Sequence, residues 1–233
     1  MNTDTLLIES LKKLVEAKYA EFSDVESSHG STHDVSTGKL GDVQYHIKFP
    51  SKYADWENIN DPSLQILTEY LAYNIYKLYG TIKIPATVHL VFKDDEIGIA
   101  SQSLKGHGWS GRESASQMKQ ILQDMASGLM VDMFLSNWDI PTSGNLFITD
   151  DGAYRIDPGG SLGFRAQGGR KGKRWLDDPS DPKWGEINTM RDSNVTGNPD
   201  YSNADLKAAA EQFNAVDWSE IESTIPVAGC VNV

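Results

Sequence analysis

Hydrophobic and polar residues follow two different periods along this chain, and the changes of period mark the predicted elements. In residues 5–22, and again in residues 61–80, apolar side chains recur at helical spacing. Residues 43–49 lie between these segments and alternate apolar with polar side chains, which predicts a strand that ends at Pro50. The alternation places Lys48 on the face opposite the apolar set.

The second half of the chain continues this mixed pattern. The predicted elements are a hairpin of strands at 86–92 and 96–101, a helix at about 113–136, short strands at 146–148 and 154–156, and two helices near 203–214 and 217–223. Residues 137–145 form a polar loop with Pro and Gly, and residues 27–33 are polar without periodicity. This order predicts an α+β fold with a sheet-rich front and a helical back.

The length of 233 residues fits one domain with a sizeable core. We expect a single domain over 1–233, with an N-lobe at about 1–103 and a C-lobe at about 104–233. No apolar run approaches the roughly 20 residues of a membrane span, and the first residues lack the basic and apolar regions of a secretory signal. The one cysteine, Cys230, excludes an internal disulfide, so we expect a reducing compartment such as the cytoplasm.

The formal net charge of −12 argues against nucleic-acid or anionic-membrane partners, because both require a positive surface. It does not exclude a nucleotide, because Mg²⁺ screens triphosphate and carboxylates from each other. A local basic cluster either grips an acidic or phosphorylated substrate or is a solvated loop. Its members are Arg165, Arg170, Lys171, Lys173 and Arg174.

Lys48 and Glu69 are the first candidates for chemistry. Taken alone, Lys48 fits a solvent-facing strand residue and Glu69 a solvated helix residue. Phosphoryl transfer needs a cation for the phosphates, oxygen ligands for Mg²⁺ and a carboxylate near the attacking hydroxyl. A strand lysine followed about 20 residues later by a helix glutamate matches the ion pair that anchors phosphates in kinases.

Two segments of the second half carry a stronger signal. In one, Asp139 and Asn145 precede a short apolar strand; in the other, a strand ends at Asp157, which Pro-Gly-Gly follows. The first arrangement is typical of a kinase catalytic loop, and the second presents a metal-chelating aspartate. Taken one at a time, these residues also fit ordinary turns. Their order, behind a long helix and after Lys48 and Glu69, favours the kinase interpretation.

With these motifs the chain resembles the atypical kinases related to the HipA toxin kinases and, more remotely, the phosphoinositide lipid kinases. The resemblance covers roughly residues 25–165, and the stretch RIDPGGSLGFRAQGG (155–169) is also similar to a small family of bacterial and phage HipA-like kinase domains. It implies a two-lobed protein-kinase-like fold that binds ATP and Mg²⁺. It also implies the site residues, which are Asp139 as catalytic aspartate, Asn145 and Asp157 as metal ligands, and Lys48 with Glu69 as the phosphate-anchoring pair.

The chain departs from the protein-kinase pattern at several positions. Trp138 precedes Asp139 where protein kinases have His-Arg, and Asn145 follows Asp139 after six residues, one more than usual. Asp157 is followed by Pro-Gly rather than Phe-Gly, so the usual aromatic switch residue is missing. The glycine-rich motif G-x-G-x-x-G is absent as well.

Two further segments are candidates for nucleotide contacts. The segment with Gly30 and Ser31 either cradles phosphates through its backbone N–H groups or is a plain surface turn. Gln102 and Ser103 follow a strand and precede the long helix, at the position where a hinge contacts adenine through its backbone.

We expect a small bacterial or phage-type kinase that transfers the γ-phosphate of ATP to a hydroxyl, on a Ser or Thr of a protein. Two alternatives stay open at this point. In the first, the chain has the same fold but transfers AMP or binds nucleotide without turnover. In the second, the chain is a non-enzymatic interaction module. The resemblance also fits an effector or toxin that acts in the bacterial cytoplasm or inside a target cell. Neither the substrate nor the oligomeric state follows from the sequence.

Overall fold

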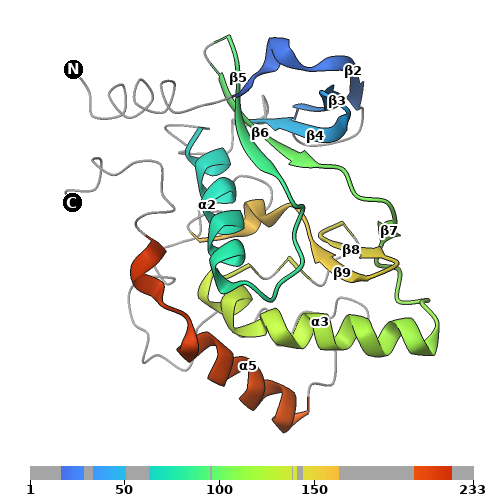
Figure 1. Cartoon of the computed structure of the whole chain (residues 1–233), viewed down its shortest axis with the longest axis vertical. Helices are drawn as coiled ribbons and strands as arrows, with labels where there is room; N and C mark the ends of the chain where they lie inside the picture. Colours follow the sequence, from blue (N-terminus) through green and yellow to red (C-terminus); the bar gives the residue numbers. More distant parts are fainter. Residues whose placement is uncertain are drawn as a thin grey trace, which may run out of the picture.

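A sheet-rich part and a helical part follow one another along the chain (Figure 1). The structure is a computed structural model, which describes residues 17–28, 34–50, 63–94, 96–137, 139–140, 144–162 and 202–221. The strands of the first part are β1 (Ala17–Lys18), β2 (Ser23–Ser28), β3 (Asp34–Leu40), β4 (Val43–Phe49), β5 (Val88–Lys93) and β6 (Glu96–Gln102). They form a six-stranded sheet in the order β1-β5-β6-β4-β3-β2, and a 3-10 turn (η1, Tyr19–Glu21) joins β1 to β2.

Helix α2 (Ser63–Tyr79) packs on one face of this sheet. Buried Tyr45, Ile47 and Phe49 of β4 fill the opposite face together with Phe22, Val91 and Ala100. On the α2 side, Ile97 and Ile99 of β6 pack against Ile66 and Tyr73. Because neighbouring strand residues face opposite sides, Lys48, the register partner of Ile99, lies on the α2 side, as predicted.

The second part is built around a long helix and a small hairpin. Its elements are β7 (His107–Gly108), α3 (Ala115–Phe134), β8 (Leu146–Thr149), β9 (Gly152–Arg155), the 3-10 turn η2 (Pro158–Gly160), α5 (Asn203–Ala215) and the 3-10 turn η4 (Trp218–Glu220). A capping box begins α3, because the Ser114 hydroxyl accepts from the Gln117 amide. Figure 1 shows β8, β9 and η2 between the large sheet and α3.

A buried ion-pair network fastens α3 to β9. The guanidinium of Arg155, only 1% exposed, donates to both carboxylate oxygens of Asp132, with the shortest bond at 2.7 Å. The same carboxylate accepts the Tyr76 hydroxyl (2.8 Å), and that hydroxyl accepts the Asn137 amide (3.0 Å). Gly128 makes room for the guanidinium, since an added Cβ would overlap it. The network therefore fixes Asn137 and Arg155, each two residues before a predicted site aspartate, Asp139 and Asp157 respectively.

Most predicted elements are confirmed. The strand at 43–49, the helix after Asp61-Pro62, the 86–101 hairpin, the long helix, the two short strands and the helix near 203–214 agree with the structure to within two residues at each end. The sheet-rich N-terminal part and the later helices confirm the predicted α+β class. Within the described residues, no helix is long and apolar enough to cross a membrane.

The predicted helix at 5–22 is wrong at its end, and residues 1–16 lie outside the described residues. Ala17 and Lys18 form β1, which pairs in parallel with β5, and a 3-10 turn follows. The open edge of β5 offers backbone partners there, and this tertiary pairing outweighs the helical period. Of the last predicted helix, at 217–223, the structure shows a 3-10 turn over Trp218–Glu220 followed by helical Ile221, and residues 222–223 lie outside the described residues. The predicted break at His107–Gly108 is the short strand β7.

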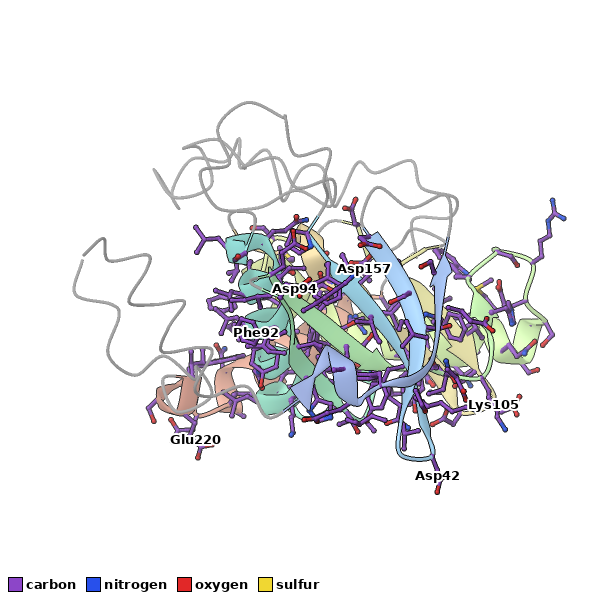
Figure 2. All side chains as sticks on the ribbon, turned by 90° about the horizontal axis from the view of Figure 1, so that it is seen from above. Asp42, Phe92, Asp94, Lys105, Asp157 and Glu220 are labelled. Carbon is purple, nitrogen blue, oxygen red and sulfur yellow. The ribbon has the colours of Figure 1, made fainter. Side chains whose placement is uncertain are left out.

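Strands β2 and β3 were not predicted, because their side chains are mostly polar. Among the residues of β2 only Val25 is apolar, so no alternation marks it as a strand. Backbone pairing defines both strands, which run antiparallel and continue the sheet beyond β4. The β3–β4 turn ends at exposed Asp42, which Figure 2 shows projecting from the body of the molecule.

Candidate active site

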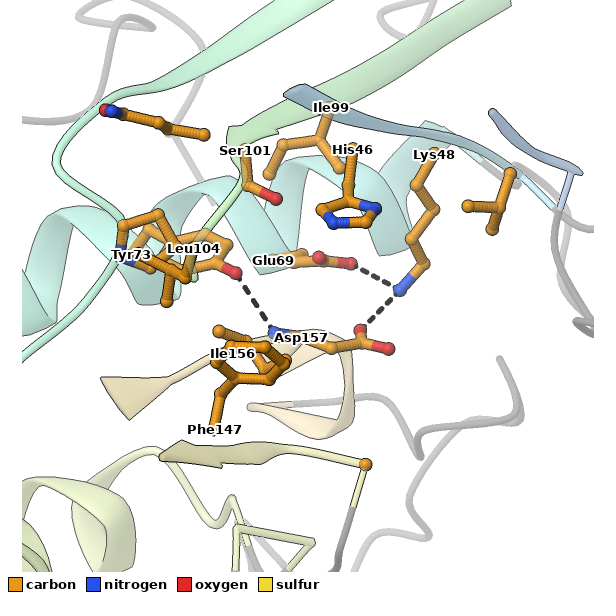
Figure 3. Close-up of a pocket in the computed structure, with 14 residues that line it drawn as sticks. His46, Lys48, Glu69, Tyr73, Ile99, Ser101, Leu104, Phe147, Ile156 and Asp157 are labelled. Carbon is orange, nitrogen blue, oxygen red and sulfur yellow. Dashed lines mark hydrogen bonds and ion pairs between the residues drawn. The ribbon is translucent and has the colours of Figure 1, made fainter. Parts of the chain in front are cut away.

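A pocket of about 250 Å³ lies between the large sheet and the β8–β9 hairpin. Its walls are apolar over most of their area and charged at one end. The apolar members are Val35, Pro85, Ile99, Leu104, Phe147 and Ile156, and the charged members are Lys48, Glu69 and Asp157. Figure 3 shows His46 and Ser101 on the sheet side of the pocket, facing Phe147 and Ile156 on the other side.

Three predicted residues meet at the charged end. The Lys48 Nζ donates to Glu69 Oε2 at 2.8 Å and to Asp157 Oδ1 at 2.5 Å (Figure 3). The side chains of Lys48 and Glu69 are 11% and 4% exposed, whereas Asp157 is 51% exposed. The structure thus joins residues that are 109 positions apart in sequence, with a buried pair at the back and an accessible carboxylate in front.

Burial and charge shift the titration of this cluster. Burial lowers the pKa of Lys48, but the charges of Asp157 and Glu69 more than reverse this effect, so its pKa lies above the ordinary value. Burial raises the pKa of Glu69 to about 7, because desolvation and the repulsion of Asp157 together outweigh the attraction of Lys48. Lys48 is therefore a cation at neutral pH, and Glu69 titrates close to neutrality.

The backbone around Asp157 has an unusual conformation. Asp157 has a φ of 49° and a ψ of 59°, the left-handed region that aspartate tolerates better than most residues. Its backbone N–H donates to the Tyr73 hydroxyl at 3.0 Å. Two residues later, an added Cβ on Gly159 would lie 3.0 Å from Glu69 Oε2 and 3.1 Å from Lys48 Nζ. The Pro-Gly-Gly sequence therefore lets the backbone pass close to the ion-pair cluster.

Asn145 connects the predicted catalytic and metal residues. The side-chain Nδ2 of Asn145 donates to the backbone carbonyl of Asp139 at 3.2 Å. The backbone carbonyl of Asn145 accepts the N–H of Ile156 at 2.9 Å. This orientation leaves the amide Oδ1 as the atom that can face a cation. Asp139 as a whole is 7% exposed and does not line the pocket.

The oxygen donors present fit Mg²⁺ of the kind that a nucleotide brings with it. Mg²⁺ commonly binds one or two protein oxygen ligands and completes its shell with phosphate oxygens and water. Asp157 lines the pocket, and Asn145 lies between the pocket-lining residues Gly144 and Phe147 without lining the pocket itself, so these two residues would supply this set. Among the described residues, no group of three or more His, Cys, Asp and Glu side chains is arranged to hold a metal.

The predicted hinge is only partly available to a ligand. Gln102 lines the pocket, as do the residues on either side of the hinge segment. However, the N–H of Gln102 donates to Thr87 O at 2.9 Å, and the N–H of Ser103 donates to Gln44 O at 2.8 Å. In the described part of the chain the next amide, that of pocket-lining Leu104, donates to no group. Leu104 is thus better placed than Ser103 to contact a bound base.

Some predicted site residues are not described by the structure, and two residues that line the pocket were not predicted. Gly30 and Ser31, and the basic cluster at 165–174, lie outside the described residues. Sequence reasoning missed Tyr73 and His46, which both line the pocket. Spacing carried a signal for each of them, since Tyr73 is one helical turn beyond Glu69 and His46 is two residues before Lys48 on the same strand face.

Fold and site together define a protein-kinase-like class. A sheet carries the lysine, the packed helix carries its glutamate partner, and the segment after the β8–β9 hairpin carries an aspartate beside that lysine. No protein-family model matches the chain, and no curated protein sequence matches it. Among solved structures the chain is similar to the proinflammatory kinase CtkA of Helicobacter pylori, with 15% sequence identity and a TM-score of 0.56.

The match with CtkA covers 89% of this chain and 84% of that chain. It extends over the sheet-rich and helical parts alike, so the whole arrangement is kinase-like. At this low identity the likeness shows the fold alone. It does not single out the HipA-like kinases, and that closer relationship stays a prediction.

Proposed function

We propose that this chain is an ATP-dependent kinase that uses Mg²⁺ and transfers the γ-phosphate to a hydroxyl group of a protein. The observation that carries the proposal is the Lys48–Glu69–Asp157 cluster at the charged end of an apolar pocket in a kinase-like fold. Apolar walls suit a nucleobase, and a buried cation beyond them suits its phosphates. The similarity to a protein described as a kinase supports phosphotransfer.

Each site residue has a role in the proposed reaction. Lys48, oriented by Glu69, binds the α- and β-phosphates of ATP. Asp157 and Asn145 would hold Mg²⁺, which supplies charge neutralisation at the phosphate oxygens. Asp139 orients the acceptor hydroxyl and takes its proton as the new P–O bond forms and the bond to ADP breaks.

The acceptor and the setting rest on resemblance and charge. The likeness of residues 155–169 to HipA-like kinase domains supports a Ser or Thr hydroxyl of a protein as acceptor, in the bacterial cytoplasm or inside a target cell. The net charge of −12 disfavours nucleic acid and anionic lipid as partners. The basic cluster at 165–174 is the segment that we propose for contact with an acidic substrate.

The first test is a thermal shift of the full chain with ATP, in Mg²⁺ or in EDTA. We expect a Mg²⁺-dependent rise in Tm for the wild type and for Asp150→Ala, a change in the exposed β8–β9 turn, and none for Asp157→Ala. Transfer from γ-labelled ATP to the chain or to Ser/Thr peptide arrays then tests the reaction. Asp139→Ala should retain the Mg²⁺-dependent shift and lose the labelling.

One observation favours a second candidate, nucleotide binding without turnover. Asp139 is buried and does not line the pocket, so in this structure it does not face a nucleotide bound there. This alternative predicts the Mg²⁺-dependent shift with no labelling from either γ- or α-labelled ATP. Transfer of the α label identifies AMP transfer instead. The absence of any nucleotide-dependent shift in the wild type would refute the kinase proposal and leave an interaction module.

A further inference from the structure

The hydroxyl of Tyr73 lies where three elements of the site meet. It comes from α2 and accepts the backbone N–H of Asp157 at 3.0 Å. It also lies near the side chain of Ser101, close to the end of β6. Figure 3 shows the bond to Asp157 beside the two ion pairs of Lys48. The hydroxyl thus joins the helix to the aspartate loop, next to the end of β6.

The Tyr73 side chain is held rigidly at this place. It is 3% exposed and packs with Ile66, Ile97 and Ile99 in the core between α2 and the sheet. Burial, reinforced by the neighbouring carboxylates, raises the pKa of the phenol well above its ordinary value. Its role rests on geometry, because the phenol oxygen accepts the amide of Asp157 at 3.0 Å.

The geometry makes α2 a common support for both halves of the charged cluster. Glu69 and Tyr73 are four residues apart on one face of this helix. Glu69 holds Lys48, and Tyr73 holds the backbone of Asp157 in its left-handed conformation. One turn of one helix therefore contacts both Lys48 and the backbone of Asp157, the two residues that form the ion pair.

We infer that Tyr73 is a positioning residue that fixes the metal-binding geometry of Asp157 through its hydroxyl. In protein kinases an aromatic residue after the metal aspartate orients that loop by packing. Here Pro158 follows the aspartate, and the orienting contact comes from the helix as a hydrogen bond. The inference rests on the proposed function, because it assigns Asp157 to a metal.

Tyr73→Phe removes only the hydroxyl, and Tyr79→Phe is a matched control. Tyr79 lies on the same helix, and its hydroxyl bonds to Ser127 O at 2.9 Å, away from the pocket. The first measurement is amide exchange of Asp157 in the nucleotide-free chain. Exchange should be about 3- to 10-fold faster in Tyr73→Phe than in the wild type and unchanged in Tyr79→Phe, since one hydrogen bond is lost.

The second measurement is a Mg²⁺ titration of the ATP-dependent thermal shift in the same three proteins. The Mg²⁺ midpoint should rise about 3- to 10-fold in Tyr73→Phe and stay unchanged in Tyr79→Phe. The effect of ATP in EDTA should be small and equal in all three proteins, because Lys48 and Glu69 are untouched. A wild-type Mg²⁺ response with an unshifted Tyr73→Phe midpoint refutes the inference alone. A wild type without any Mg²⁺ response refutes the proposed function, and with it the metal role of Asp157.

Discussion

The chain without nucleotide should lose stability as the pH rises from about 4.5 to about 7 because of Glu69. The lower limit is the ordinary pKa of this carboxyl group, and the upper limit is its pKa in the folded chain. In this window the unfolded chain has released the proton and the folded chain still holds it. The stabilising contribution is therefore fully present below about 4.5 and lost as the pH rises through about 7. One pKa unit corresponds to about 1.4 kcal/mol, so the loss amounts to about 3 kcal/mol.

The physical cause is one cation between two carboxylates. Lys48 lies within hydrogen-bond distance of both Glu69 and Asp157, and Glu69 is almost completely buried. When both carboxylates are charged, the cluster carries a net negative charge in a poorly solvated place. A proton on Glu69 removes that excess.

Urea unfolding of wild type and Glu69→Gln between pH 4.5 and 8 measures this effect. The amide of this variant cannot titrate, and the other carboxylates are common to both proteins, so the difference in unfolding free energy isolates Glu69. We expect the wild type to lose about 3 kcal/mol relative to the variant over this range. A difference that stays constant with pH would show that Glu69 ionises as an ordinary exposed carboxylate, and would contradict the buried cluster.

Three further substitutions test the cluster, the buried network and the pocket wall. Lys48→Met leaves two carboxylates without their cation and should lower the free energy of unfolding in urea by about 3–5 kcal/mol at pH 8. Lys39→Met, in an exposed ion pair, should change nothing measurable, and equal effects of the two substitutions would refute the role of burial. Arg155→Met strands the buried carboxylate of Asp132 and should cost about 3–5 kcal/mol in the same assay; a loss below about 1 kcal/mol would contradict the network. Phe147→Ala should weaken ATP binding about 5- to 10-fold by calorimetry, and unchanged affinity would mean that the base does not lie on this wall.

The elements that the sequence predicted well are those with one strongly buried face. β4 alternates because Tyr45, Ile47 and Phe49 enter the core, and α2 shows a helical stripe because it packs on the sheet. β2 and β3 bury few apolar side chains, so hydrophobic periodicity carries no information about them. Their position depends on backbone pairing with β4, which no local pattern records.

The same distinction applies to the site. Residue type and order predicted Lys48, Glu69 and Asp157, and the structure brings all three together. Tyr73 was missed because a tyrosine in an amphipathic helix is most simply a core residue, and only the folded geometry shows where its hydroxyl points. Ser103 shows the reverse case, since its place after the strand suggested a hinge contact but the sheet uses its amide.

The arrangement of charges also implies an order of dependence between metal and nucleotide. A triphosphate entering alone meets Asp157, a half-exposed carboxylate that already shares Lys48, so like charges oppose its binding. Because Asp157 stands at the accessible side, it can turn toward a divalent cation without disturbing the buried Lys48–Glu69 pair. Lys48 is then available to phosphates, and the repulsion becomes attraction. Nucleotide and Mg²⁺ should therefore bind as a unit, and the thermal shift in EDTA against Mg²⁺ tests this coupling, because an equal rise in both conditions would contradict it.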